Sequence, residues 1–195
     1  EIGYDSYMQG IETDFLKYEG QIDPKYTGGL NTTLRWKSLS MNLFFTFQAG
    51  NVIRLNPVFS SSYSDITALP NEFKDRWIMS GDEQRTDIPA IADNLMQKLY
   101  LSSAYPYNNY NYSSARVAKG DFIRLKSLSI NYELPSALVR KSRVFKRAAV
   151  RLTAKDLWLM YSDKALNGQD PEFFNTGGVA MPVQTQFVLS LDLGF

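Results

Sequence analysis

Apolar and polar residues alternate along several segments of this chain, each about as long as a membrane-spanning β-strand. One alternating run covers residues 30–36, and a second covers 39–48 after the short connection Lys37-Ser38. Two alternating runs joined by so few residues predict a β-hairpin. Three more runs follow, at 121–133, 150–161 and 183–195. The pattern therefore predicts about five antiparallel strands.

The fourth run contains a break in its alternation. The apolar positions of residues 150–154 share one phase, whereas those of 157–161 are displaced from it by one residue. An extra residue in a strand moves all following side chains to the opposite face, which is the effect of a β-bulge. We expect this bulge near Lys155 and Asp156.

Residues 50–120 lack sustained alternation and contain four of the prolines, Pro57, Pro70, Pro89 and Pro106. Short helical pieces are predicted near 71–79 and 90–100. A segment this long between two strands is unusual in a compact domain unless the loop itself has a function.

The connections differ in length between the two ends of the predicted strands. The short connection 37–38 and the basic connector 134–147 lie at one end, and the long segments 50–120 and 162–182 lie at the other. Outer-membrane barrels have this asymmetry, with short periplasmic turns and long extracellular loops.

Aromatic residues gather at both ends of the strands, as bilayer interfaces favour. Trp36, Tyr132 and Phe195 lie at one end, and Phe47, Phe122, Trp158 and Tyr161 lie at the other. The predicted fold class is all-β, an antiparallel transmembrane β-barrel. Five strands cannot close a barrel, so we expect residues 1–195 to be the C-terminal fragment of one barrel domain, with 50–120 as a long extracellular loop. The alternative is a soluble antiparallel sandwich, such as a carbohydrate-binding module.

The composition excludes several classes of function. The chain has no cysteine and no histidine, and its 21 Lys and Arg nearly balance its 20 Asp and Glu. A Cys–His or Ser–His–Asp catalytic group, a thiolate zinc site and a disulfide are therefore impossible. The charge balance also gives no basis for a nucleic-acid partner. Because the acidic pair Asp82-Glu83 has no flanking catalytic group, we expect neither an enzyme nor a cofactor.

Two groups of loop residues have more than one interpretation. Asp163, Asp170 and Glu172 could hold a cation, but their spacing favours scattered acids in a solvated loop, so no metal site is predicted. The four tyrosines of the segment 105–112 could form a stacking surface for cargo or a lid, or they could pack the loop on itself. These tyrosines are Tyr105, Tyr107, Tyr110 and Tyr112.

Four segments, in order, resemble motifs of the SusC/RagA family of TonB-dependent outer-membrane transporters. They are DPKYTGGL at 23–30, GDFIRLK at 120–126 with YELP at 132–135, KDLW at 155–158 and GQDPE at 168–172. The family-motif positions are Pro24, Tyr26, Gly28, Gly29, Arg124, Leu125, Asp170, Pro171 and Glu172.

The resemblance implies a transporter in the outer membrane of a Gram-negative bacterium that imports nutrients, either glycan oligosaccharides or peptides. It also implies a SusD-like surface lipoprotein as partner, contact with outer-membrane lipid, and a TonB complex that acts through an N-terminal part absent from this chain. The last strand resembles the family's terminal strand, which implies an assembly signal. Its residues are Phe187, Leu189, Leu191, Leu193 and Phe195.

Overall fold

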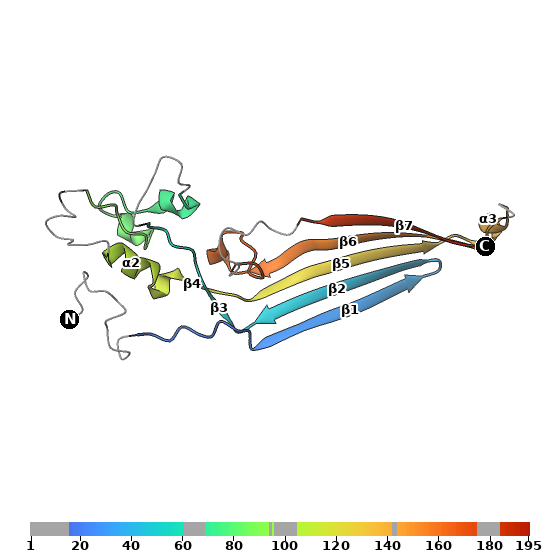
Figure 1. Cartoon of the computed structure of the whole chain (residues 1–195), viewed down its shortest axis with the longest axis horizontal. Helices are drawn as coiled ribbons and strands as arrows, with labels where there is room; N and C mark the ends of the chain where they lie inside the picture. The colour runs from blue at the N-terminus through green and yellow to red at the C-terminus, as the bar shows by residue number, and fades with distance from the viewer. Residues whose placement is uncertain (1–15, 61–68, 94, 96–104, 142–143, 175–183) are drawn as a thin grey trace. The chain divides into compact units, whose positions relative to one another are not determined.

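The computed structural model describes residues 16–60, 69–93, 95, 105–141, 144–174 and 184–195 (Figure 1). The strands are β1 (Tyr26–Trp36), β2 (Leu39–Ala49), β3 (Val52–Arg54), β4 (Val117–Lys119), β5 (Phe122–Glu133), β6 (Arg147–Ser162) and β7 (Gln186–Gly194). The helices are α2 (Tyr105–Asn111) and α3 (Ser136–Lys141), with short 3-10 helices η3 (Asn71–Asp75), η4 (Asp82–Gln84), η5 (Ser114–Arg116) and η6 (Lys164–Leu166). Within these ranges, no helix has both the length and the apolar character that a membrane span requires.

The long strands form one five-stranded sheet in the order β1-β2-β5-β6-β7, and β3 pairs with β4 in a separate two-stranded sheet. Every neighbouring pair in the large sheet is antiparallel, as Figure 1 shows. The all-β antiparallel prediction is therefore confirmed, and within this chain the sheet stays open rather than closing into a barrel.

The register produces one apolar and one polar row across all five strands. Leu34 pairs with Met41, and the row continues through Ile130 and Leu152 to Leu189. Because successive residues of a strand point to opposite faces, the row one position along faces the other way. That row consists of Arg35, Ser40, Asn131, Arg151 and Ser190. We call these two surfaces the apolar face and the polar face.

Side chains of the polar face also bond across strands. The Asn42 side-chain amide donates to Asn31 Oδ1 at 2.7 Å and to Thr33 Oγ1 at 3.0 Å. The hydroxyls of Ser129 and Thr153 lie 3.0 Å apart. Such cross-strand pairs help to fix the strand register and satisfy the hydrogen-bonding groups of the polar face.

The predicted bulge is present, and it involves both β5 and β6. Ser127 pairs with Lys155, but the next pair is Leu125 with Trp158, so Lys126 stands opposite two residues of β6. One of these two is Asp156, which has a φ of 51°. The bulge returns Leu125 to the apolar face although strict alternation would place it on the polar face.

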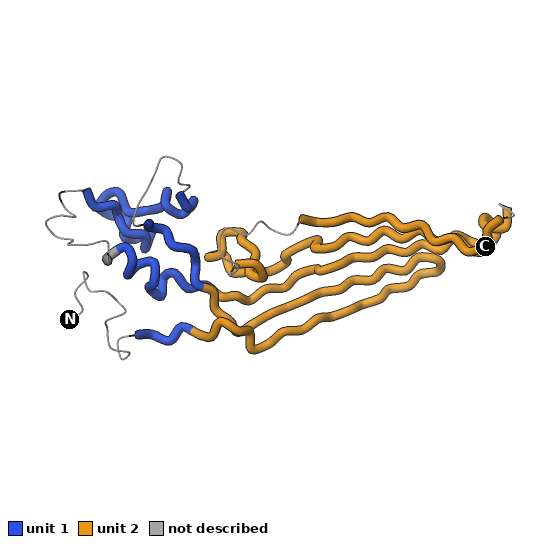
Figure 2. Tube along the Cα trace, viewed as in Figure 1, with its two compact units in different colours: residues 1–19, 54–118 blue, residues 20–53, 119–195 orange. Residues whose placement is uncertain are grey.

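The chain divides into two compact units, coloured separately in Figure 2. Unit 1 contains residues 1–19 and 54–118, and unit 2 contains 20–53 and 119–195, including the five-stranded sheet. In unit 2, the residues just before β3 (50–51) and just after β4 (120–121) are joined by hydrogen bonds. Gly50 N donates to Asp121 Oδ1 at 2.7 Å, and Gly120 N donates to the Asn51 carbonyl at 2.9 Å.

Unit 1 is built around the ring of Phe59. Tyr107 stacks on this ring at 4.6 Å between centroids, and Tyr110 and Phe73 meet it edge-on. The buried Asn111 side chain accepts from the backbone N–H of Val58 and donates to the Phe59 carbonyl. A single amide thus satisfies the backbone of a segment that lies far from it in the sequence.

The structure corrects several sequence-based expectations. The helix expected over 71–79 is only η3, because Arg76 is extended and the backbone N–H groups of Ile78 and Met79 donate to the Asp82 carboxylate in a turn. The connector 134–147 contains the helix α3. Phe122 is buried with 5% exposure and does not join the outer aromatic belt. In the helix expected over 90–100, residues 94 and 96–100 lie outside the described ranges.

Candidate functional site

Two of the family-like motifs meet in a buried ion pair. Arg124 Nη2 lies 2.5 Å from both carboxylate oxygens of Asp170, and the two side chains are 4% and 6% exposed. Arg124 belongs to β5 and Asp170 to the loop that follows β6. The pair therefore fixes residues of this loop against the polar face of the sheet.

The bulge at Lys126 explains why Arg124 reaches this position. Counted from Leu128 without a bulge, Arg124 and Phe122 would point to the apolar face. The extra residue places Arg124 opposite Thr46 and Phe122 opposite Gln48, which are polar-face positions of β2. The Arg124 guanidinium then lies over the Phe122 ring, 5.7 Å from its centroid.

Further charges surround this buried pair. Glu172 Oε2 is 3.5 Å from Arg124 Nε and 3.8 Å from Lys126 Nζ. Lys126 Nζ also lies 2.7 Å from Asp156 Oδ1, so the bulge residues of β5 and β6 are joined by their own ion pair. We call this cluster of Arg124, Lys126, Asp156, Asp170 and Glu172 the ion-pair network. A buried arginine with this many partners tolerates burial because its charge is compensated.

The acidic residues of the last loop are thus engaged with protein groups. Asp163 accepts from the backbone N–H of Lys119 at 2.9 Å and of Ala165 at 3.0 Å, and it caps η6. These bonds from Ala165 and Lys119 lower the pKa of Asp163. Across the described residues, no group of three or more acidic side chains is arranged to hold a metal ion.

The other family-motif residues have structural positions in the hairpin and loop. Pro24 precedes β1, and Tyr26, which is exposed, begins it. A Cβ on Gly28 would lie 2.7 Å from the Phe47 ring, and a Cβ on Gly29 would lie 2.9 Å from the Phe44 ring. The two glycines therefore leave room for aromatic rings on both sides of β1. Leu125, on the apolar face, and Pro171, in the loop after β6, are both buried.

The candidate tyrosines differ in their surroundings. Tyr107 packs on Phe59, and its hydroxyl accepts from Ala92 N at 2.6 Å. Tyr110 is half-buried, and this burial raises its pKa. Tyr112 is 56% exposed, with the Arg54 guanidinium 5.6 Å from its ring centroid. Tyr105 begins α2, and its side chain lies outside the described part of the structure.

The residues of the predicted assembly signal lie on β7 and just beyond it. Phe187, Leu189, Leu191 and Leu193 share the apolar face, and the Phe195 ring is 5.2 Å from that of Phe145. β7 is an edge strand of the sheet, so one of its sides has no partner strand within the described chain.

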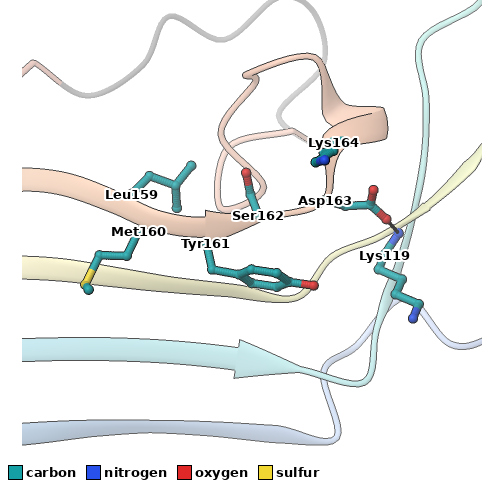
Figure 3. A pocket seen from close by; sticks show the side chains of 7 residues that line it. All are labelled: Lys119, Leu159, Met160, Tyr161, Ser162, Asp163 and Lys164. Atoms are coloured by element: carbon teal, nitrogen blue, oxygen red, sulfur yellow. Dashed lines mark hydrogen bonds between the residues drawn. The ribbon is translucent and has the colours of Figure 1, made fainter.

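Unit 2 also contains a pocket of about 560 Å³ at the end of β6 (Figure 3). Its lining combines aliphatic, aromatic and charged side chains from the ends of β4 and β6 and the start of the last loop. These residues are Lys119, Leu159, Met160, Tyr161, Ser162, Asp163 and Lys164.

This chain resembles known receptors and importers in sequence and in fold. Over 162 residues the chain is 29% identical to TonB-dependent receptor P3 of Formosa agariphila, a match that covers 83% of this chain. Its fold matches the RagAB peptide importer in the open-open state, with a TM-score of 0.63 and 23% identity over 92% of this chain. The resemblance to SusC/RagA-type TonB-dependent receptors is confirmed.

The SusC/RagA-type fold is also found in a structure of the RagAB peptide transporter, with a TM-score of 0.62 and 24% identity over 91% of this chain. The chain spans only 14% of the Formosa receptor and 18% of each RagAB chain. No protein-family model matches the chain. The matched proteins are receptors and importers rather than enzymes.

Sequence reasoning identified the residues of the buried pair but not their contact. In the sequence, Arg124 and Asp170 belong to separate motifs, and Asp170 also belongs to the acidic group weighed as a cation site. A usable signal was present: on a strand with an apolar face, an arginine at an apparently apolar position requires either a bulge or a buried partner. The lysines of the pocket carried no such signal, because isolated lysines in loops are common on any protein surface.

Proposed function

We propose that this chain is part of a TonB-dependent transporter in the outer membrane of a Gram-negative bacterium, where its five-stranded sheet forms part of the barrel wall. The observation that carries the proposal is the continuous apolar face, which crosses all five strands and is backed by a polar face. Lipid covers an outward apolar face in a barrel wall, and the aqueous lumen or a plug covers the inner polar face.

The exposure of the apolar face favours the membrane over the soluble alternative. Leu189 is 73% exposed and Leu34 is 53% exposed, and both belong to the same cross-strand row. A soluble carbohydrate-binding module would cover such a face with a second sheet, because large apolar patches on soluble proteins promote association.

The segment 50–120 is proposed to be extracellular, together with the loop after β6. These long segments leave the same end of the sheet, whereas the β1–β2 turn and α3 lie at the opposite end (Figure 1). In this orientation unit 1 is available to cargo and to a SusD-like lipoprotein, and energy would come from TonB through parts of the transporter outside this chain. The proposed cargo is a glycan oligosaccharide or a peptide.

Membrane location is tested with the full-length parent transporter in its own cells. We expect the parent to fractionate with the outer membrane, to require detergent for extraction, and to expose an epitope inserted at 81–82 to antibody on intact cells. An epitope inserted at Lys37 should be accessible only after the outer membrane is permeabilised. Extraction without detergent, or the reverse pattern of accessibility, would contradict the proposal.

The role in cargo uptake is tested with two tyrosines of different surroundings. Tyr112→Ala removes an exposed ring, and Tyr107→Ala removes a ring that packs on Phe59. If the exposed ring contacts cargo or lid, Tyr112→Ala should lower uptake of a peptide or oligosaccharide at unchanged surface abundance. Tyr107→Ala should instead increase protease sensitivity of unit 1. Unaltered uptake in Tyr112→Ala would remove this residue from the proposed contact.

A further inference from the structure

The pocket at the end of β6 is asymmetric in its lining (Figure 3). Met160 and Tyr161 form one wall, and the Tyr161 hydroxyl is directed toward Lys119 and Asp163. Lys164, at the start of η6, lies next to Asp163 in the same lining. All of these residues belong to unit 2. The pocket therefore combines an aromatic and aliphatic wall with a charged rim.

Neither lysine of the pocket forms an ion pair with a described residue, although the Asp163 carboxylate lies near enough to Lys119 to interact with its charge. Among the described residues, neither Lys119 nor Lys164 has an acidic side chain within ion-pair distance. Asp163 lies between them in the lining, but its two oxygens are occupied by backbone N–H groups. The lining thus contains two lysines and one aspartate, an excess of one positive charge, together with the Tyr161 hydroxyl, which can donate to an anion.

The apolar wall of the pocket continues into the apolar face of the sheet. Tyr161 pairs with Ile123, and Ile123 pairs with Phe47, which forms the outermost apolar row of β2, β5 and β6. Trp158, which pairs with Leu125 in the neighbouring apolar row, is 59% exposed. An occupant with an anionic head in the pocket would therefore have apolar surface next to it on which hydrocarbon chains can lie.

We propose that this pocket binds the phosphate group of a phosphorylated membrane lipid, whose acyl chains lie on the apolar face beside Trp158 and Phe47. The inference rests on the proposed function, which places this end of the sheet at the outer leaflet. Lysines next to an aromatic belt match the charge of lipid phosphates at that depth. A soluble anionic cargo would use the charges but not the adjoining apolar row, so the geometry favours a lipid.

The test uses the full-length parent transporter in phosphatidylcholine nanodiscs that contain a minor fraction of a phosphorylated glycolipid, with native mass spectrometry as the readout. Lys119→Gln and Lys164→Gln should each lower retention of the glycolipid about fivefold, and the double variant about 30-fold. The matched control is Lys141→Gln in α3, at the opposite end of the sheet, which should leave retention unchanged. A dephosphorylated form of the same glycolipid should be retained no better by the wild type than by the double variant.

Several outcomes overturn the inference. Equal retention in wild type and double variant would show that the lysines are not used, and an equal loss in Lys141→Gln would show only general charge attraction. Displacement of the glycolipid by inorganic phosphate at comparable concentration would identify a free-anion site instead. Outer-membrane fractionation of each variant is measured in the same cells, so a failure of the proposed function is seen separately from a failure of lipid binding.

Discussion

Replacing Asp170 by alanine removes the carboxylate that faces Arg124 in the buried core of the ion-pair network. Arg124 then keeps its charge at a position with 4% exposure, and only Glu172 remains near it, at 3.5 Å from Nε. Removal of one partner from a buried ion pair costs about 3–5 kcal/mol. The protein avoids this cost when the loop opens and water reaches the guanidinium, so we expect the variant to shift the loop toward an open state.

The size of this shift can be worked out for the loop amides. Each factor of ten in a population corresponds to about 1.4 kcal/mol, so a cost of about 3 kcal/mol raises the population of the open loop about 100-fold. The Phe173 amide, which donates to the Asp170 carbonyl at 3.1 Å, reports opening without depending on the deleted side chain. Its exchange with deuterium in the full-length parent protein, followed by mass spectrometry, should accelerate by that factor.

The double variant Arg124→Met with Asp170→Leu separates charge from packing. Replacement of a buried ion pair by apolar residues of similar size is often neutral, so the Phe173 amide should be protected nearly as well as in the wild type. Amides of the β1–β2 hairpin serve as an internal control. If Asp170→Ala accelerates exchange less than tenfold, or if the double variant is as open as the single one, the ion pair does not hold the loop.

Three further expectations follow from the two faces, the glycine contacts and the carboxylates. If the sheet spans the bilayer as proposed, Leu43→Arg on the apolar face should destabilise the folded parent protein by about 2–4 kcal/mol, whereas Asn42→Arg on the polar face should cost much less. A refolding titration in which the two variants are equal would contradict the face assignment. Gly120→Ala should destabilise unit 2 by about 1–3 kcal/mol because its Cβ would lie 2.2 Å from the buried Asn51 side chain, and Asn51→Ala in the same chain should recover part of the lost thermal stability. Backbone N–H groups of Met79 and Ile78 and the Arg85 side chain lower the pKa of Asp82. The ionised Asp82 therefore stabilises the fold of unit 1 above a pH of about 4, the usual Asp value, and this stabilisation is lost as pH falls through the lowered pKa. Protease sensitivity of unit 1 should rise in that acidic window in the wild type and be high at all pH values in Asp82→Asn.

Strand positions could be predicted from the sequence because the period of two is a local property. The runs at 30–36 and 39–48 became the hairpin of β1 and β2. The register is irregular at the predicted position near 155–156, but Trp158 keeps the phase of Ala154, and the phase changes only at Met160. The bulge on β5 leaves a weaker mark in the sequence, namely the two cations Arg124 and Lys126 at positions that the count from Leu128 makes apolar. That bulge is why Phe122 was assigned to the aromatic belt although it is buried.

The contacts between segments that are distant in the sequence could not be predicted from the hydrophobic pattern, for a different reason. Asn111 satisfies the backbone near Phe59, and Arg116 forms an ion pair with Glu72, in a segment without repeating periodicity. Such contacts depend on how an irregular chain folds back on itself, and no spacing rule encodes them. The same holds for the pocket at the end of β6, whose lysines come from β4 and η6.

The bonded junctions beside β3 and β4 have a consequence for how this protein can diversify. Because Gly50 is tied to Asp121 and Gly120 to Asn51, the chain departs from the sheet and returns to it at neighbouring points. The entropy of closing a loop rises only slowly with its length, by about 0.6 kcal/mol for each doubling. Insertions, deletions or wholesale exchange of the residues between these junctions would therefore leave strand register almost untouched, so descendants of this protein can replace this segment while they inherit the same sheet.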